Sequence, residues 1–493
     1  MFRMQSRMCG VSSRDRERVK IEDVKLVENY VRISGKLYFQ ILYVTDQGEP
    51  MPAVLDGKIP FEEMVYTEGE ERTQYFVRNI RVEFGTTLVH SRKISIRAMI
   101  EMEVGCENLI EEETAVDLES SASIYKKQKP VNLLKLHTAK KDTYRIKEEI
   151  TIPGTKESIG QVLLTDITGR KLEVRAAQDE LLLRGELQIF CMYLSEEGKT
   201  DWLEQSVPYE GRIECSGATE GMYYDVQHAL EDTLADVRMD EDGEMRIIGI
   251  EGTVSLRINL YEEEELNLLE DLYSLEQKVS YQTREAVYEE LLLQNQSKCK
   301  IVENLSLPEL KDDVLQICHS SGSVQIEHVE TRAEKQGGIL IEGILHVSFL
   351  YLKADDALPF GNWQGMVPFS YLLECPDMPK DVRYQLSNRV EQISVTMTGS
   401  DSVEVKAVLD FDVFLRKEVP MQVITEVSLE ETDREELDEK PGIVGYMVKS
   451  GDDLWTLAKQ YMTTEESIRQ INHLENGKIK PGDKLIICKE IGM

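Results

Sequence analysis

The sequence predicts a mainly β, multidomain protein: tandem β-rich repeats of sandwich or barrel type, followed by a small strand–helix–helix–strand module. Three observations support this fold class. Apolar residues alternate with a period of two over many short segments, the same segments recur three times along the chain, and residues 445–487 have the pattern of strand, helix, helix and strand. With 493 residues, of which 41% are hydrophobic, the chain has room for roughly three or four domains that each bury a core.

The clearest repeated segment carries a Gly followed eight residues later by a Tyr. Apolar residues alternate between the two, which predicts a half-buried β-strand, and the Gly inside it predicts a bulge or a close backbone approach. The three copies are VRISGKLYFQILYV (31–44), LLLRGELQIFCMYL (181–194) and LIEGILHVSFLYLK (340–353).

Further anchors extend the repeat on both sides. An apolar–Pro–aromatic triplet follows each copy at 59–61, 207–209 and 367–369, and Pro predicts a sheet edge or the start of a strand. A last alternating strand then recurs at 94–104, 248–258 and 403–413. The segments YRIKEEITIP (144–153) and CKIVENLSLP (299–308) precede the second and third copies. The first copy has no such segment, so we expect it to be trimmed or to begin differently.

These anchors predict the domain boundaries. The repeats span 1–120, 121–280 and 281–427, with 428–443 as an acidic linker and 444–493 as the terminal module. Acidic segments at 107–121, 261–272 and 428–442 are expected to be helices or loops. The last of them, which ends in Pro441-Gly442, predicts a flexible tether.

Composition narrows the classes of partner. The 57 basic and 91 acidic residues give a net charge of −34, which disfavours binding to nucleic acid or to anionic lipid. The charge suits a partner with basic surfaces, or serves only solubility. No stretch approaches ~18 uninterrupted apolar residues, and the N-terminal sequence lacks the apolar run of a signal peptide. The eight cysteines are scattered, so we expect a cytoplasmic protein with reduced thiols.

The terminal module shows helix start and stop signals. Tyr446 begins the expected first strand, Gly451 turns the chain, and Asp452 or Asp453 caps a helix. We expect Thr463 and Glu466 to form a capping box for a second helix. The remaining positions expected on the apolar helix faces, in turns and in the closing strand are Leu454, Leu457, Ala458, Tyr461, Ile468, Ile471, Asn472, Gly477, Pro481-Gly482 and 484–487.

The pattern Y-x-V-x-x-G-D-x-L-W-x-x-A, then I-x-x-x-N, then I-x-x-G-x-x-L-x-I resembles the LysM domain over essentially its whole length. Asp453 stands where members of that family often carry Thr. The resemblance implies a binding groove between two loops. Its residues here would be Gly451, Asp452, Asp453 and Leu454 on one side and Ile479, Lys480, Pro481 and Gly482 on the other. Trp455 is either a ligand platform or part of the core.

No catalytic motif accompanies these segments. The sequence has no GxxxxGK[ST], GxGxxG, HExxH or GxSxG stretch, and its seven histidines are isolated. Cys318 and His319 are adjacent but have no further metal ligand at suitable spacing, so a structural role is expected. We therefore expect no enzymatic activity, no cofactor and no metal site.

Gly–Tyr β-repeats followed by one LysM domain resemble the SipL-like family of spore coat morphogenetic proteins of clostridial spore formers, in which SPOCS-type domains precede a LysM. The resemblance implies a non-enzymatic scaffold in the mother cell, at the outer forespore membrane. It implies that the LysM domain docks the basement-layer ATPase of the coat, the stage IV sporulation protein A, and links it to other coat proteins. A protein that binds peptidoglycan through N-acetylglucosamine chains remains the alternative.

Overall fold

The computed structural model describes residues 2–3, 8–10, 15–45, 51–68, 73–90, 92–333, 337–353, 359–431, 441–474 and 478–490. Backbone contacts divide the chain into two units. The first unit comprises Met1–Leu109, Leu136–Glu262 and Leu292–Arg416, and the second comprises Ile110–Lys135, Glu263–Leu291 and Lys417–Met493.

Each of the three predicted repeats contributes two sheets, and the Gly–Tyr strand is the central strand of the first sheet every time. These first sheets are β3 (Asp15–Val27), β4 (Tyr30–Thr45) and β5 (Met51–Tyr66), with β2 (Met8–Gly10) on β4; β9 (Ile159–Ala177), β10 (Glu180–Ser195) and β11 (Thr200–Glu214); and β15 (Val314–Arg332), β16 (Gly338–Lys353) and β17 (Phe360–Glu374).

The strand that the alternation predicts at the end of each repeat is present, and it lies at the centre of one of the three second sheets. Their strands, in spatial order, are β1 (Phe2–Arg3), β7 (Lys93–Asn108) and β6 (Thr73–His90); β12 (Tyr223–Met239), β13 (Met245–Ser274) and β8 (Ile124–Thr151); and β14 (Gln277–Ser306), β19 (Ser402–Glu431) and β18 (Val382–Met397), with a 3-10 turn, η1 (Pro308–Leu310), after β14.

The repeat Gly makes room for the aromatic residue of the apolar–Pro–aromatic triplet. Gly185 lies directly opposite Tyr209, and a Cβ at Gly185 would come within 2.5 Å of that ring. The same pairing joins Gly35 to Phe61 and Gly343 to Phe369. Beside each Gly, the ladder to the neighbouring strand also shifts register. The close approach predicted for the Gly is thereby confirmed, and the conserved spacing from Gly to triplet is explained by a cross-strand pair.

The second and third repeats each have an extensive core, in which Tyr193 and Tyr351 are buried. The core of the first repeat is smaller in the described residues: Phe39, Ile41, Tyr43 and Ile94 form its buried cluster. Among the residues that the structure describes, β1 of its second sheet comprises Phe2–Arg3, whereas the long strands β8 and β14 supply core side chains to the other two repeats.

The three repeats share a further core on the other face of their Gly–Tyr strands. Leu42, Met192 and Leu350, each seven residues after the repeat Gly, belong to one buried cluster. His319 completes it: its ring stacks on Phe190 at 4.2 Å, and its Nε2 lies 3.0 Å from Asp166. The sequence left open whether the repeats pack together; within the first unit they do, and His319 has the structural role expected of it.

In the second unit, parts of four long strands form small apolar clusters. The acidic segment 261–272 lies in β13, so the helix or loop expected there is wrong. The reason is its interleaved leucines: Leu268, Leu269 and Leu272 are all buried, whereas Glu263, Glu265 and Glu270 are exposed. Of the predicted linker 428–443, residues 428–431 belong to β19, and 432–440 lie outside the described residues.

Candidate functional site

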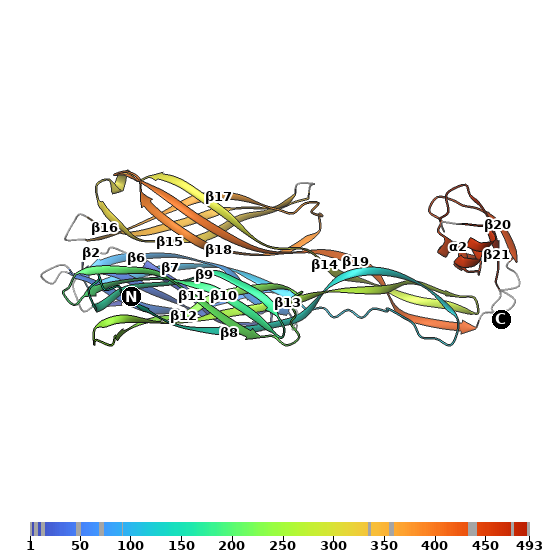
Figure 1. Cartoon of the computed structure of the whole chain (residues 1–493), viewed down its shortest axis with the longest axis horizontal. Coiled ribbons are helices and arrows are strands. Elements are labelled where there is room, and N and C mark those ends of the chain that lie inside the picture. Colours follow the sequence, from blue (N-terminus) through green and yellow to red (C-terminus); the bar gives the residue numbers. More distant parts are fainter. Residues whose placement is uncertain are drawn as a thin grey trace. The chain divides into compact units, whose positions relative to one another are not determined.

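The terminal module has the predicted order of elements. β20 (Ile443–Met447) pairs antiparallel with β21 (Lys484–Cys488), and α2 (Leu454–Gln460) and α3 (Glu465–Ile471) lie between them in the chain (Figure 1). Asp453 caps α2, since its Oδ1 accepts a hydrogen bond from Thr456 N at 2.7 Å.

The cap of the second helix differs from the prediction by one residue. Thr464, and not Thr463, is the N-cap of α3: its Oγ1 accepts from Ser467 N at 3.1 Å. Thr463 is fully buried, and its N–H donates to Ala458 O, which continues the turn that ends α2. A hydroxyl held in the core in this way cannot reach the next helix, so its half-buried neighbour Thr464 forms the cap.

Asn472 does more than form the expected turn. Its Nδ2 donates to Ile468 O at 2.9 Å and Ile486 O at 2.8 Å, and its Oδ1 accepts from Ile486 N at 2.7 Å. The side chain therefore ties the end of α3 to β21. Ile468 is buried as predicted, whereas Ile471, expected on the same apolar face, is exposed.

The two loops of the predicted groove lie next to each other. Val448 connects them: its N–H donates to Asp483 O at 2.9 Å, and its carbonyl accepts from Gly482 N at 2.8 Å. Gly451 and Gly482 have φ of +95° and +94°, a left-handed conformation that favours Gly, and both face open space. Each loop therefore turns at a glycine, and open space lies beside both glycines.

The side chains of the predicted groove divide into two groups. Leu454 is buried in the module core and Ile479 packs partly against that core. Asp452 accepts hydrogen bonds from Tyr446 OH and Lys449 N, both at 2.8 Å, so it braces its own loop. The remaining groove residues, Gly451, Asp453, Lys480, Pro481 and Gly482, are exposed and form the surface that a ligand could contact.

Trp455 is neither a platform in this groove nor only a core residue. Its ring packs edge-on against Tyr273 at 4.9 Å, and its Nε1 donates to Asp271 Oδ2 at 2.8 Å. Lys459, one helical turn later, forms an ion pair with the same carboxylate, and Tyr281 OH donates to it at 2.6 Å. We call Asp271 and its three side-chain partners, Trp455, Lys459 and Tyr281, the Asp271 centre. It fastens α2 to the 263–291 segment of the second unit.

The charge of Asp271 is stabilised where it lies. Partial burial opposes ionisation, but hydrogen bonds from Lys459, Tyr281, Trp455 and the backbone N–H of Leu272 outweigh it, so the pKa of Asp271 is lowered. Sequence reasoning missed this centre because Asp271 and Trp455 are 184 residues apart in the chain.

An apolar surface lies on the outer face of the strand pair. Ile443, Met447 and Ile486 are exposed, the first by 70% and the last by 52%. Gly445 pairs with Ile486, which makes Ile443 and Met447 its diagonal neighbours. Ile471 is also exposed, and it precedes Asn472, whose side chain bonds the backbone of Ile486. We call these four residues the terminal apolar patch. The only sequence signal for it was the alternation along β20, which places Ile443 and Met447 on one face of the strand and Val444 and Tyr446 on the other.

A cavity of about 410 Å³ lies in the first unit between the second and third repeats. Burial raises the pKa of Asp225 in its wall to about 6 and lowers that of His228 to about 3. Arg389 already pairs with Asp410 and Asp412, at 2.6 and 2.7 Å, so the cavity's charges compensate one another.

Within the described residues, no three His, Cys, Asp or Glu side chains are grouped so as to hold a metal ion. In the same part of the chain, no helix is both long and apolar enough to cross a bilayer.

Comparisons with known proteins identify both kinds of domain. The family model for the LysM domain matches residues 446–487, and the family model described as "SipL, SPOCS domain" matches 16–86, 158–238 and 313–398. No curated protein and no solved structure matches the chain. Each SPOCS match covers the three long strands of a repeat's first sheet and the strand that follows them, β3 to β6, β9 to β12 and β15 to β18. Both families are non-catalytic binding domains of the kind found in spore-associated proteins. The chain thus belongs with the SipL-type proteins, as three SPOCS domains followed by a LysM domain.

Proposed function

We propose that this protein is a non-enzymatic adaptor of spore coat assembly, whose LysM domain docks the stage IV sporulation protein A at the forespore surface. The domain combination supports a spore-associated binding protein. The observation that carries the finer proposal is the terminal apolar patch, because exposed aliphatic side chains of this kind favour a protein surface over a hydrated sugar chain.

The groove between Gly451 and Gly482 supports a second candidate, the binding of peptidoglycan glycan. Its loops are adjacent, open and flanked by exposed polar side chains, the arrangement that the LysM resemblance implies for sugar recognition. The patch and the groove use different residues of the module, so substitutions separate the two candidates.

The test is a pull-down of purified stage IV sporulation protein A by the full chain, compared with chains carrying Ile486→Glu or lacking residues 445–493. A charge at the centre of the patch adds an uncompensated desolvation cost, and we expect binding to fall at least about tenfold. Leu234→Glu is the matched control, because Leu234 is exposed by 57% in the second repeat, and it should bind like the unchanged chain.

Unaltered capture by both changed chains would refute the proposal. Sedimentation with purified peptidoglycan tests the second candidate. Binding that survives Ile486→Glu but is lost with Lys480→Glu and Asp453→Lys would favour the groove and the glycan.

A further inference from the structure

The cavity between the second and third repeats is formed by side chains from five strands. Its lining consists of residues 172–175 of β9, 224–226 and 228 of β12, 294–296 of β14, 389 of β18 and 412–414 of β19. Glu173 and Asn295 are exposed and mark its opening. Asp225 and His228 are half-buried in its wall. With a volume of about 410 Å³, the cavity has room for a small organic molecule.

Asp225 is a carboxylate without a partner in this wall. Among the described residues, no hydrogen bond or ion pair reaches it, and its Oδ2 is closed off from solvent. Arg389 is engaged elsewhere, because it pairs with Asp410 and Asp412. The compensation of charge around Arg389 therefore does not extend to Asp225.

The more distant charges around Asp225 do not replace a partner. Burial is the largest influence on this carboxyl and raises its pKa to about 6. Arg257 of β13 and Arg416 of β19 act against burial, whereas Glu107 of β7 and Asp412 act with it. Two positive and two negative charges thus oppose each other from a distance. At neutral pH the carboxylate is mostly ionised, with no opposite charge in contact with it.

His228, on the same strand as Asp225, does not supply the missing positive charge. Burial and the neighbouring Arg389 lower its pKa to about 3, so its ring is neutral at physiological pH. Its Nε2 lies 3.5 Å from Arg389 Nη1 and accepts that hydrogen bond, since a guanidinium only donates. A cation that enters the cavity therefore meets a carboxylate that can only accept and an uncharged ring.

Apolar side chains from three strands line the same cavity. They are Leu172 and Val174 of β9, Val226 of β12, and Val413 and Phe414 of β19. Their surface suits an aliphatic chain, as the stem of a lysine side chain packs along apolar surface while its charged end finds a polar group. The cavity thus combines an apolar lining with one ionised and unpaired carboxylate.

We propose that this cavity binds an aliphatic amine, whose ammonium group pairs with Asp225 and whose stem packs on the apolar lining. The ammonium group is a donor only, which matches a carboxylate that lacks donors. Because the lining comes from the second and third repeats, an occupied cavity joins them. The site uses no residue of the LysM module, so it does not depend on the function proposed for that module. A free amine or a lysine side chain of another protein carries the same chemistry.

The probe is hexylamine, added to the full chain and followed by ligand-detected NMR. We expect it to bind at least about tenfold more tightly than hexan-1-ol, which has the same stem without the charge, and Asp225→Asn should remove this difference. Asp236→Asn is the matched control, because Asp236 is also half-buried on β12 but pairs with Arg238 at 2.6 Å. Each variant loses one acid from a chain of net charge −34, so general attraction of the amine to the surface is equal in both.

The pH dependence gives a second measurement. Since Asp225 must be ionised to pair with the amine, affinity should be constant well above pH 6 and fall as the pH passes below it. Between pH 7.5 and pH 5 the ionised fraction falls about tenfold, and so should the affinity of the unchanged chain. His228 does not titrate in this range, because its pKa is about 3. The affinity of the Asp225→Asn chain should not change.

Nα-acetyl-lysine N-methylamide distinguishes the two sources of the amine. Binding at least as tight as that of hexylamine would assign the site to a lysine side chain of another protein. Weaker binding would assign it to a free amine. Both results support the ammonium site.

Three results would overturn the inference. Hexylamine could bind equally to the Asp225→Asn and Asp236→Asn chains, or hexan-1-ol could bind the unchanged chain as tightly as the amine. The third concerns thermal unfolding without ligand. We expect Asp225→Asn to leave the unfolding temperature unchanged or to raise it, because the change removes an unpaired charge from a half-buried position. A lower temperature would mean that the carboxylate already has a partner within the chain.

Discussion

Asp271→Asn should release the LysM module from the 263–291 segment. The carboxylate accepts hydrogen bonds from Trp455 Nε1 at 2.8 Å and Tyr281 OH at 2.6 Å, and it forms an ion pair with Lys459. The Asn side chain has the same shape and keeps one acceptor oxygen, but it loses the negative charge. Its NH2 group would also face donors that now bond to the second carboxylate oxygen. Hydrogen bonds to a charged group contribute about 1.5–3 kcal/mol each, so a net loss of about 2–3 kcal/mol is expected, which shifts the docking equilibrium about 30- to 150-fold.

The change can be measured by hydrogen exchange of α2 in the full chain and by the fluorescence of Trp455 in a chain with Trp202→Phe and Trp363→Phe. Undocking exposes the indole that now packs on Tyr273, so its emission should shift to the red. Glu270→Gln is the matched control. Glu270 is the adjacent acid, its ion pair with Lys127 at 3.3 Å is at the surface, and such pairs contribute about 0–1 kcal/mol. Equal exchange in the two variants would refute the role given to Asp271.

The same contact has a predictable pH dependence. Because the pKa of Asp271 is lowered in the folded chain, its stabilising effect is complete above the unfolded value near 4 and is lost as the pH falls through the folded value. Docking should therefore be constant from about pH 7 to pH 5 and weaken below about pH 4. In the Asp271→Asn chain this acid-induced part should be absent; an identical acid response in both chains would contradict the assignment.

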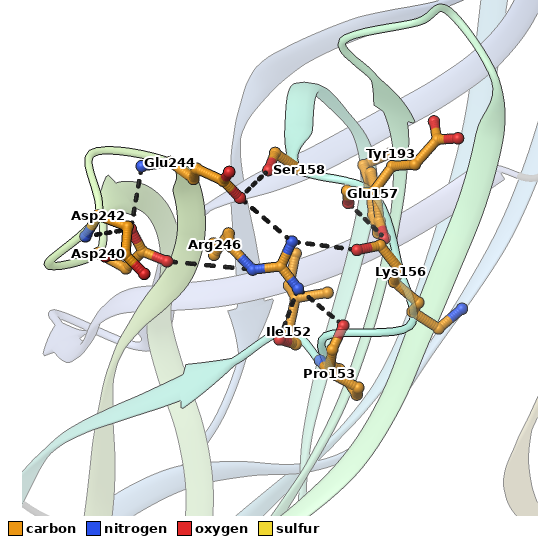
Figure 2. Close-up of polar contacts among 10 residues, drawn as sticks. All are labelled: Ile152, Pro153, Lys156, Glu157, Ser158, Tyr193, Asp240, Asp242, Glu244 and Arg246. Atoms are coloured by element: carbon orange, nitrogen blue, oxygen red, sulfur yellow. Dashed lines mark hydrogen bonds and ion pairs between the residues drawn. The ribbon is translucent and has the colours of Figure 1, made fainter.

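Two further predictions concern the repeats. Gly343→Ala would place a Cβ 2.2 Å from Gln325 O, and such overpacking should lower the free energy of unfolding, measured by chemical denaturation, by about 1–3 kcal/mol. Gly154→Ala is the control and should have little effect, because nothing lies within 4 Å of its Cβ position. Equal stabilities of the two variants would contradict the close approach at Gly343. Arg246→Ala removes three hydrogen bonds to backbone carbonyls (Figure 2) and should speed amide exchange at Ile152 at least about tenfold, with unchanged exchange as the opposing result.

Much of the fold could be predicted from patterns that are local in the sequence. The period-two alternation located the central strands β4, β10 and β16, and the spacing from Gly to the Pro-aromatic triplet reflected a direct cross-strand pair. The LysM motif predicted the order of strands and helices in the terminal module, and a cap of the first helix at Asp452 or Asp453, of which Asp453 is the cap. These features depend on neighbours along the chain or on one adjacent strand, so their signals stay together in the sequence.

Local patterns failed where distant residues decide the outcome. The acidic run 261–272 has the composition of a solvated segment, yet its leucines are buried because β13 packs against other strands. Thr463 and Thr464 are equivalent as cap residues in a sequence, and only the burial of Thr463 makes Thr464 the cap of α3.

The sequence by itself determined that this protein is a series of three related β-domains with a LysM module, because alternation, turn residues and caps are local and recur at fixed spacings. Only the tertiary structure decided which surfaces are used and which are left open. It placed Trp455 against Asp271, gathered Ile443, Met447 and Ile486 on one outer face, and packed the three Gly–Tyr strands into one shared core. Burial and pairing depend on residues far apart in the chain, so no local pattern could show them.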